Sequence, residues 1–180
     1  MVEDQAGTTS AQVSSLRAVA HPLRLRILSL LTGAEMSAAE LARELDVSHA
    51  NTSYHLRVLA DAQLVEEAGE EKIRGGVAKR YRHPWDRPDA PQPKATSEDR
   101  ELYLRAMGEE LVRRFGHRKS PSTSKLTDAE MWVTPETWNQ VVAHVEEASR
   151  LIHAEARPPR TKGTIHVNLT AAVFEMDLDG

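Results

Sequence analysis

The sequence predicts a mainly helical α+β fold, in which a three-helix unit with a β-hairpin is followed by a C-terminal helical region with a late β-strand. Apolar residues recur at helical spacing between Leu16 and Ala60. A polar, glycine-containing stretch then separates two strand-like segments. Ser97 and Thr134 are helix-start signals that precede two longer amphipathic segments. The 180 residues allow one domain of ordinary size or two small ones, and the four prolines between Pro84 and Ser97 favour two. We expect a disordered N-terminus over 1–13, a first domain over 14–84, a Pro-rich linker over 85–97 and a C-terminal region over 98–180.

The first predicted helix begins at Pro22, since proline lacks the N–H that would be unpaired in a first turn. The helix is expected to have one apolar face, which consists of Leu23, Ile27, Leu30 and Leu31. The second helix begins at Ser37, whose hydroxyl can cap the first turn while Glu40 caps in return. Its buried side is expected to hold Leu41 and Leu45.

Ser48 caps the third predicted helix, in which Thr52, Leu56 and Leu59 share the inward face. Only Asp46 and Val47 separate it from the second helix, so the connection must be a sharp bend. This is the pattern of a helix-turn-helix.

The outward face of the third helix suits a DNA major groove, because short side chains allow close approach and polar groups can reach base edges and phosphates. A solvated polar face is the alternative interpretation, since any surface helix is polar on one side. The candidate contact residues are Ser48, His49, Ala50, Asn51, Ser53, Tyr54 and Arg57.

A β-hairpin is predicted after Leu64, Val65 and Glu66, with Gly75 and Gly76 at its tip. Between Lys72 and Arg82 the segment has five basic residues and no acidic one, as expected for a wing that lies along phosphates. A solvated hairpin would more often mix signs. The basic residues are Lys72, Arg74, Lys79, Arg80 and Arg82.

The runs "AHPLRLRILSLL", "MSAAELARELDVSHANTSYHLRVLADAQLVEE" and "GGVAKRYR" together resemble the arsenic-resistance-repressor (ArsR) family of winged helix-turn-helix regulators. The resemblance covers residues 14–85, and "SxxxxSYHLRVLxxAxLV" from Ser48 is its most specific part. It implies a dimeric repressor that binds double-stranded DNA at a pseudo-palindromic operator. Some members sense metals through cysteines or through His and Asp. This chain has no cysteine, which excludes thiolate sensing of arsenite, cadmium or lead.

The net charge of −4 argues against indiscriminate nucleic-acid binding, whereas a specific binder needs only a local basic surface. No apolar run is long enough for a membrane helix, and Met1 to Ser14 lacks the apolar centre of a secretory signal. We therefore expect a cytoplasmic protein without membrane contact.

In the C-terminal region, a helix capped by Ser97 is predicted from Glu98 to about His117, with candidate buried positions Leu102, Met107, Leu111, Val112 and Phe115. A second helix begins at Thr134-Pro135 and reaches about Ala156, with an apolar stripe of Trp138, Val141, Val142, Val145, Leu151 and Ile152. Strands are predicted at Met131 to Val133 and at Thr164 to Met176, where alternate residues are apolar. Such a strand needs a partner within the domain or across a dimer.

The function of this region stays open between a dimer interface and a pocket for a small-molecule effector. A metal-responsive regulator is a further alternative, because His144, Glu147, His153, Glu155 and His166 are potential ligands. Their spacing is poor, since His153 lies two and a half turns from His144, and surface histidines explain them better. We predict neither a metal nor a cofactor.

An enzyme is not expected, because no activated nucleophile, acid/base pair or cofactor loop is visible. Gly75-Gly76 lacks the spacing of a nucleotide-binding loop, and a histidine before a helix, such as His21, is usually a cap. A second hypothesis is a winged-helix module for protein contact, with the C-terminal region as its active part. The basic hairpin counts against it.

Overall fold

The computed structural model describes residues 14–73, 75–87, 94–121 and 124–177. The predicted disorder over 1–13, the linker residues 88–93 and the candidate contact residue Arg74 lie outside the described residues. The elements in chain order are α1 (Ser15–Val19), α2 (Pro22–Gly33), β1 (Met36–Ser37), α3 (Ala38–Leu45), α4 (His49–Asp61), β2 (Glu66–Ile73), β3 (Gly76–Arg82), α5 (Ser97–Gly116) and α6 (Pro135–Ala154).

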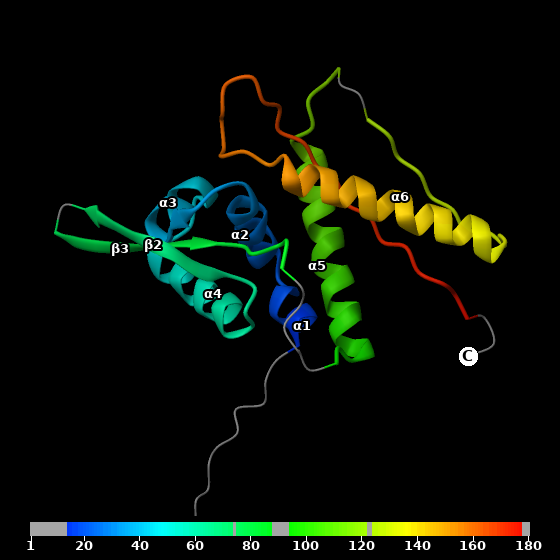
Figure 1. Cartoon of the computed structure of the whole chain (residues 1–180), viewed down its shortest axis with the longest axis horizontal. Helices are drawn as coiled ribbons and strands as arrows, with labels where there is room; N and C mark the ends of the chain where they lie inside the picture. Colours follow the sequence, from blue (N-terminus) through cyan, green and yellow to red (C-terminus); the bar gives the residue numbers. More distant parts are fainter. Residues whose placement is uncertain (1–13, 74, 88–93, 122–123, 178–180) are drawn as a thin grey trace, which may run out of the picture.

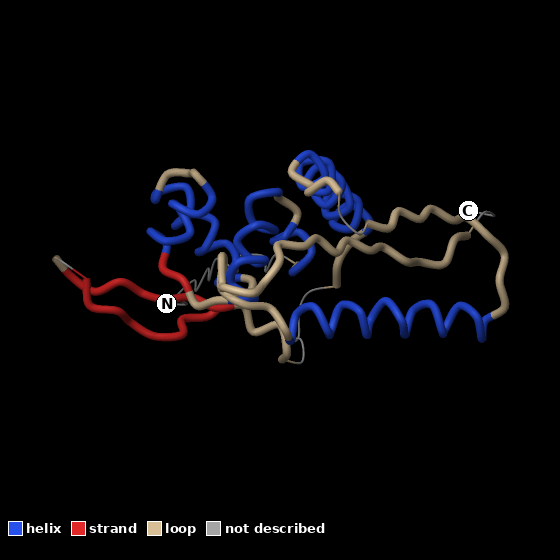
Figure 2. The backbone as a smooth tube through the Cα atoms, turned by 90° about the horizontal axis from the view of Figure 1, so that it is seen from above, coloured by secondary structure: helices blue, strands red, loops and turns tan. Residues whose placement is uncertain are grey.

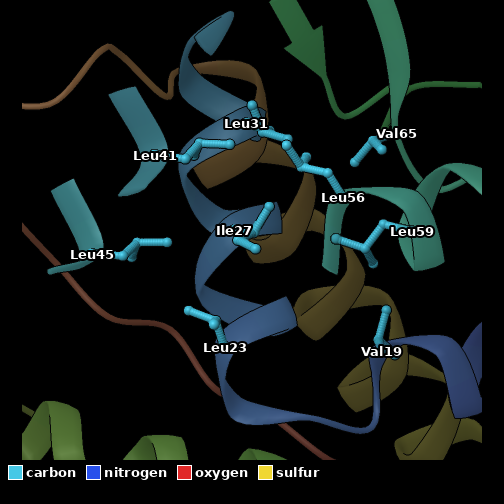
Figure 3. Close-up of a cluster of buried hydrophobic side chains, with 9 residues drawn as sticks. All are labelled: Val19, Leu23, Ile27, Leu31, Leu41, Leu45, Leu56, Leu59 and Val65. Carbon is cyan, nitrogen blue, oxygen red and sulfur yellow. The ribbon is translucent and has the colours of Figure 1, made fainter. Parts of the chain in front are cut away.

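One hydrophobic core lies among α2, α3 and α4, and Figure 3 shows its side chains. Ile27, Leu41 and Leu59 are completely buried. The predicted inward faces of these three helices are confirmed, except that Leu30 is only partly buried. The core residues are Val19, Leu23, Ile27, Leu31, Leu41, Leu45, Leu56, Leu59 and Val65.

The helix starts follow the predicted chemistry. Pro22 is in the first turn of α2, and His21 Nδ1 accepts a hydrogen bond from the Leu23 N–H at 3.1 Å. Ser37 and Glu40 form a reciprocal capping box at α3. The sequence did not reveal α1 or β1, because five and two residues are too few for a periodic pattern.

The predicted hairpin is confirmed, and it belongs to a three-stranded antiparallel sheet in the order β1-β3-β2. Met36 pairs with Tyr81 across β1 and β3, while Glu66 pairs with Arg82 across β2 and β3. The register shifts between Glu67 and Gly69, which marks a bulge in β2. Strands β2 and β3 project beyond the helices at one end of the molecule (Figure 1).

Helix α5 packs against α1 and α2, and its first turn is fixed by a buried carboxylate. Asp99 accepts hydrogen bonds from Ser14 Oγ at 2.8 Å, from Arg17 Nη1 at 3.2 Å and from the Thr96 N–H at 3.1 Å. These bonds, led by that of the Thr96 backbone, lower the pKa of Asp99 to about 2. The cap is therefore Thr96 and not Ser97 as predicted, because Thr96 and Asp99 form a capping box.

The predicted buried face of α5 is wrong. The buried residues of α5 are Asp99, Ala106 and Glu110, and Tyr103 is partly buried against the hydrophobic core. Glu110 is neutralised by Arg113 and Arg114 of its own helix. Polar side chains can occupy this contact because their hydrogen bonds and charges are satisfied there. The apolar residues remain outside: Leu102, Leu111, Val112 and Phe115 are exposed, and Met107 is partly exposed.

Helix α6 is confirmed with Thr134 as its cap, but none of its residues is buried. In the predicted stripe, Val141 and Leu151 are exposed and the other four residues are partly exposed. Figures 1 and 2 show why: α6 extends away from the three-helix unit, at the end opposite to the hairpin tip.

Both strands predicted in the C-terminal region are wrong. Met131 to Val133 and Thr164 to Met176 have no regular structure, and Trp132 is 92% exposed. An alternating pattern makes a strand only when another strand supplies ladder partners, and the described residues of one chain supply none for these segments.

The C-terminal end of α6 and the residues after it contact α2, α3 and the segment that follows β3. The Arg157 carbonyl oxygen approaches Gly33, at the end of α2, so closely that a Cβ added to the glycine would lie 2.8 Å from it. Arg160 Nη1 lies 2.6 Å from Glu44 Oε2. The rings of Trp85 and His153 have centroids 5.6 Å apart. Over the described ranges, the helices include none with the length and apolar character of a membrane span.

Candidate nucleic-acid interface

The turn between α3 and α4 is as tight as predicted. Asp46 ends α3 in the left-handed conformation with φ 55°, which Asp tolerates better than most residues. The Asp46 and Val47 N–H groups both bond to the Ala42 carbonyl, and the Val47 bond is 3.0 Å long. Ser48 Oγ then accepts the Asn51 N–H at 3.2 Å and starts α4. The angle between the helices is thus determined by local hydrogen bonds.

The candidate contact residues of α4 lie on its outward face. Six of them are exposed, and Ser53 is partly buried. Arg57 Nε donates to the Ser53 carbonyl at 3.4 Å, and its guanidinium is otherwise exposed. The exposed six are Ser48, His49, Ala50, Asn51, Tyr54 and Arg57. The helix therefore presents small, polar and basic groups beside its first two turns, opposite its leucines.

His55, on the inward side of α4, is a residue that the sequence analysis missed. Its ring packs against that of His21 with centroids 4.5 Å apart and the planes tilted by 42°, and Tyr54 meets it edge-on with centroids 5.1 Å apart. Within the described chain, His55 Nδ1 and the nearby Arg24 Nε are buried without hydrogen-bond partners. Burial, and then the charges of His21 and Arg24, lower the pKa of His55 to about 4. His55 therefore supports α4 as a neutral ring.

The wing carries both signs of charge, contrary to prediction. Strand β2 supplies Glu66, Glu67, Glu70 and Glu71, which the sequence analysis did not weigh because it counted charges only from Lys72 onward. Lys79 Nζ lies 2.6 Å from Glu67 Oε1, and Arg82 Nη2 lies 2.5 Å from Glu66 Oε1. Antiparallel pairing brings these groups together from opposite ends of the hairpin sequence.

Arg80 is the most constrained of the wing cations that the structure describes. Its Nη1 lies 2.6 Å from Glu71 Oε2 and 3.2 Å from Glu40 Oε2, and its Nη2 donates to the Glu35 carbonyl. It links the wing to the start of α3. Lys72, by contrast, is exposed near the tip and forms no ion pair with a described residue.

The residues of the metal hypothesis are not brought together. His153 Nδ1 donates to the Ser149 carbonyl, Glu147 pairs with Arg150, and Glu155 pairs with Arg157. Within the described ranges, no three His, Asp or Glu side chains are placed to hold a metal ion.

Comparison with known proteins finds a family model, a curated relative and a solved structure that are similar to parts of this chain. Residues 19–68 match the family model described as a helix-turn-helix domain. The chain is 33% identical over 51 residues to the transcriptional repressor SdpR of Bacillus subtilis (strain 168), which is 28% of this chain and 57% of that protein. The chain thus spans little more than half of this curated relative.

A solved structure also shows similarity, that of fragment 1–100 of a possible transcriptional regulatory protein from Mycobacterium bovis. The sequence identity is 21%, the TM-score is 0.33, and the match covers 58% of this chain and 88% of that one. The matched family model and the α3-turn-α4 geometry together establish that residues 19–68 form a helix-turn-helix domain.

Proposed function

We propose that the chain is a sequence-specific DNA-binding transcriptional regulator, acting as a dimeric repressor at a pseudo-palindromic operator. The observation that carries the proposal is the outward face of α4, which offers small and polar side chains around an exposed Arg57 directly after the tight turn. Such a face fits the major groove, where base edges present donors and acceptors. Repression is proposed from the similarity to SdpR.

The test is a titration of the purified chain against the DNA upstream of its own gene, at several salt concentrations and with unrelated DNA as competitor. Tight, competitor-resistant binding that weakens steeply with salt is expected, because phosphate contacts release counterions. Weak and competitor-sensitive binding to this DNA and to genomic fragments would contradict the proposal and favour the protein-contact module.

Arg57→Ala is expected to weaken operator binding by about 1–3 kcal/mol if Arg57 reads a base, and to relax specificity at that base pair. The measurement compares the affinities of wild type and variant for the operator and for single-base variants of it. Arg105→Ala on α5 is a matched control, since Arg105 is also exposed and forms an ion pair with Glu101 of its own helix. Equal losses of operator affinity in both variants would show that α4 does not enter the major groove with Arg57 at a base.

Lys79→Ala is expected to weaken binding to all DNA sequences about equally, and to reduce the salt slope by about 1, because a wing lysine contacts phosphate. Glu67→Gln should act in the opposite direction, since it frees Lys79 from an exposed ion pair worth little to the fold. Filter binding at three or more salt concentrations measures both. An unchanged slope in Lys79→Ala would exclude phosphate contact by this side chain.

We propose that the outward face of α5 forms the dimer interface. Leu104, Leu111 and Phe115 recur at coiled-coil spacing on the side opposite Ala106 and are 44%, 39% and 44% exposed. Gly108 completes the stripe, and beyond its chain neighbours and the backbone of its own helix no described atom lies within 4 Å of where its Cβ would be. Two such faces can pack closely around the glycine, and a two-fold axis here would pair the two α4 helices for a palindromic site.

Leu111→Glu is expected to convert the dimer to a monomer, since it places a charge in the centre of an apolar contact. Size-exclusion chromatography with light scattering measures the mass of each variant. Leu126→Glu, at an 80% exposed loop position, should leave the mass unchanged. A monomeric wild type, or a dimeric Leu111→Glu variant, would rule out this interface.

A further inference from the structure

A cavity of about 560 Å³ lies where the C-terminal end of α6 meets the turn between α4 and β2. Residues 60 and 62–66 form one wall, Ser149, Arg150 and His153 form another, and His83 to Trp85 lie between them. The volume is within the range of small-molecule sites in proteins. A molecule in this cavity would touch both the end of α4 and the C-terminal region.

The cavity has an aromatic wall. The Trp85 and His153 rings are tilted by 40° with centroids 5.6 Å apart, and both side chains are only partly buried. Partly covered aromatic rings in a cavity offer apolar surface to a further planar ring, which gains by stacking or edge contact. This wall favours an aromatic molecule over an aliphatic one.

Two histidines in the wall have a defined tautomer. His83 Nδ1 lies 2.6 Å from the Leu64 carbonyl oxygen, and His153 Nδ1 lies 2.7 Å from the Ser149 carbonyl oxygen. A carbonyl can only accept, so both Nδ1 atoms carry hydrogen, and each neutral ring keeps Nε2 as an acceptor. Burial lowers the pKa of His83, which favours its neutral form. The wall therefore suits a ligand that donates a hydrogen bond, such as a phenol.

The charge of the wall favours an anion. Arg150 is paired with Glu147, which does not line the cavity, and both side chains are more than half exposed. Such an exposed pair is weak, so a ligand carboxylate can replace it. The carboxylate in the wall, Glu66, is already shared between Arg82 and Arg87.

We propose that this cavity binds a hydroxylated aromatic carboxylate of one or two rings, and that binding changes the affinity of the chain for DNA. The ring lies against Trp85, the carboxylate pairs with Arg150, and the phenol donates to a histidine Nε2. The ligand connects α6 to the residues that follow α4 and begin the wing, so it acts on both DNA-contacting elements. The regulatory part rests on the proposed function, whereas the binding part does not.

The first experiment is a calorimetric titration of the full chain, without DNA, with 6-hydroxy-2-naphthoate. Saturable binding at one site per chain is expected, with the corresponding amide at least about 10-fold weaker because it cannot pair with Arg150. Trp85→Leu and Arg150→Gln should each weaken binding by about 10-fold or more, a loss on the order of one charge-assisted or aromatic contact. Each variant is first checked for folding by circular dichroism.

The matched controls are Trp132→Leu and Arg105→Gln. Trp132 is 92% exposed and does not line the cavity, and Arg105 forms an exposed helical ion pair like that of Arg150. Both variants should bind the naphthoate as wild type does. Failure of the wild type to bind it saturably, or equal affinity in the Trp85→Leu and Trp132→Leu variants, would overturn the site.

The second experiment repeats the DNA titration with saturating 6-hydroxy-2-naphthoate. A changed DNA affinity in wild type but not in Trp85→Leu is expected. An unchanged affinity would overturn the regulatory part and leave the site standing. Absence of specific DNA binding with or without the naphthoate would overturn the proposed function and the regulation, while the calorimetric result would still decide the site.

Discussion

Acidification from pH 7 to pH 4 is expected to destabilise the three-helix unit by about 2–3 kcal/mol through His55 alone. The pKa of His55 is about 4 in the folded chain and 6.5 without burial. Between these values the unfolded chain binds a proton that the folded chain does not, so stability falls by about 1.4 kcal/mol per pH unit. About one pH unit above 6.5 both states are almost fully unprotonated, and the effect vanishes.

The neighbours of His55 strengthen this expectation. The pKa of His21, whose ring packs against that of His55, is also lowered, first by burial and then by the charge of Arg24. The positive charge of Arg24 therefore opposes protonation of either ring. Glu40 and Asp99 do not add to the change in stability between pH 5 and pH 7. The pKa of Glu40 is lowered from 4.5 and that of Asp99 to about 2, so both carboxylates remain charged over this range. Their stabilisation is therefore retained above about pH 5.

The measurement is urea unfolding of wild type and of His55→Phe between pH 5 and pH 7. The Phe ring keeps the volume of the imidazole and cannot titrate, so the variant should lose the part of the pH slope that comes from His55. The remaining slope comes from His21 and His83, whose pKa values are also lowered by burial. His49→Phe is the matched control, since His49 is exposed at the start of the same helix. Retention of the full wild-type slope in His55→Phe would disprove the assignment.

Leu59→Ala is expected to reduce the free energy of unfolding by about 2–5 kcal/mol, because truncating a fully buried leucine loses apolar burial and leaves a cavity. Leu59 lies within the core formed by α2, α3 and α4 (Figure 3). Urea unfolding at pH 7 measures the loss. Leu126→Ala, at an 80% exposed position, should change stability by no more than about 0.5 kcal/mol.

Leu59→Ala also distinguishes an effect on folding from an effect on DNA contact. Leu59 lies two residues after Arg57, and so nearly on the opposite side of α4. The DNA affinity of the folded fraction should therefore change far less than in Arg57→Ala. A loss of stability below about 1 kcal/mol would mean that the core repacks around position 59.

The features of the helix-turn-helix that depend on neighbouring residues could be predicted from the sequence. Pro22, the capping box of Ser37 with Glu40, and the Ser48 cap act within one turn of helix, and the structure confirms them. The leucine spacing also gave the correct inward faces, because a periodic apolar stripe can be buried in only one orientation. The outward positions on α4 could then be predicted, because they are the positions on the side of the helix opposite its buried residues.

The C-terminal region was harder to predict for a physical reason. Its helices could be located from their caps, since Thr134 and Pro135 act locally, but the face that packs depends on the surface it meets. In α5 that surface offered Ser14 and Arg17 to the Asp99 carboxylate, so the packed face combines Asp99 and Glu110 with Ala106 and Tyr103, and the leucines stayed outside. The segment from Thr164 to Met176 has a strand pattern but no partner strand within the described chain.

The sequence by itself determined where the helices begin, how α3 turns into α4 and which side of α4 faces outward, because capping, turn geometry and helical periodicity act over a few residues. The tertiary structure alone decided that β2 glutamates pair with Lys79, Arg80 and Arg82, and that His55 packs against His21. It also joined α6 to the α4–β2 turn around a cavity. These contacts join residues far apart in the chain, and only packing brings their charges and rings within reach.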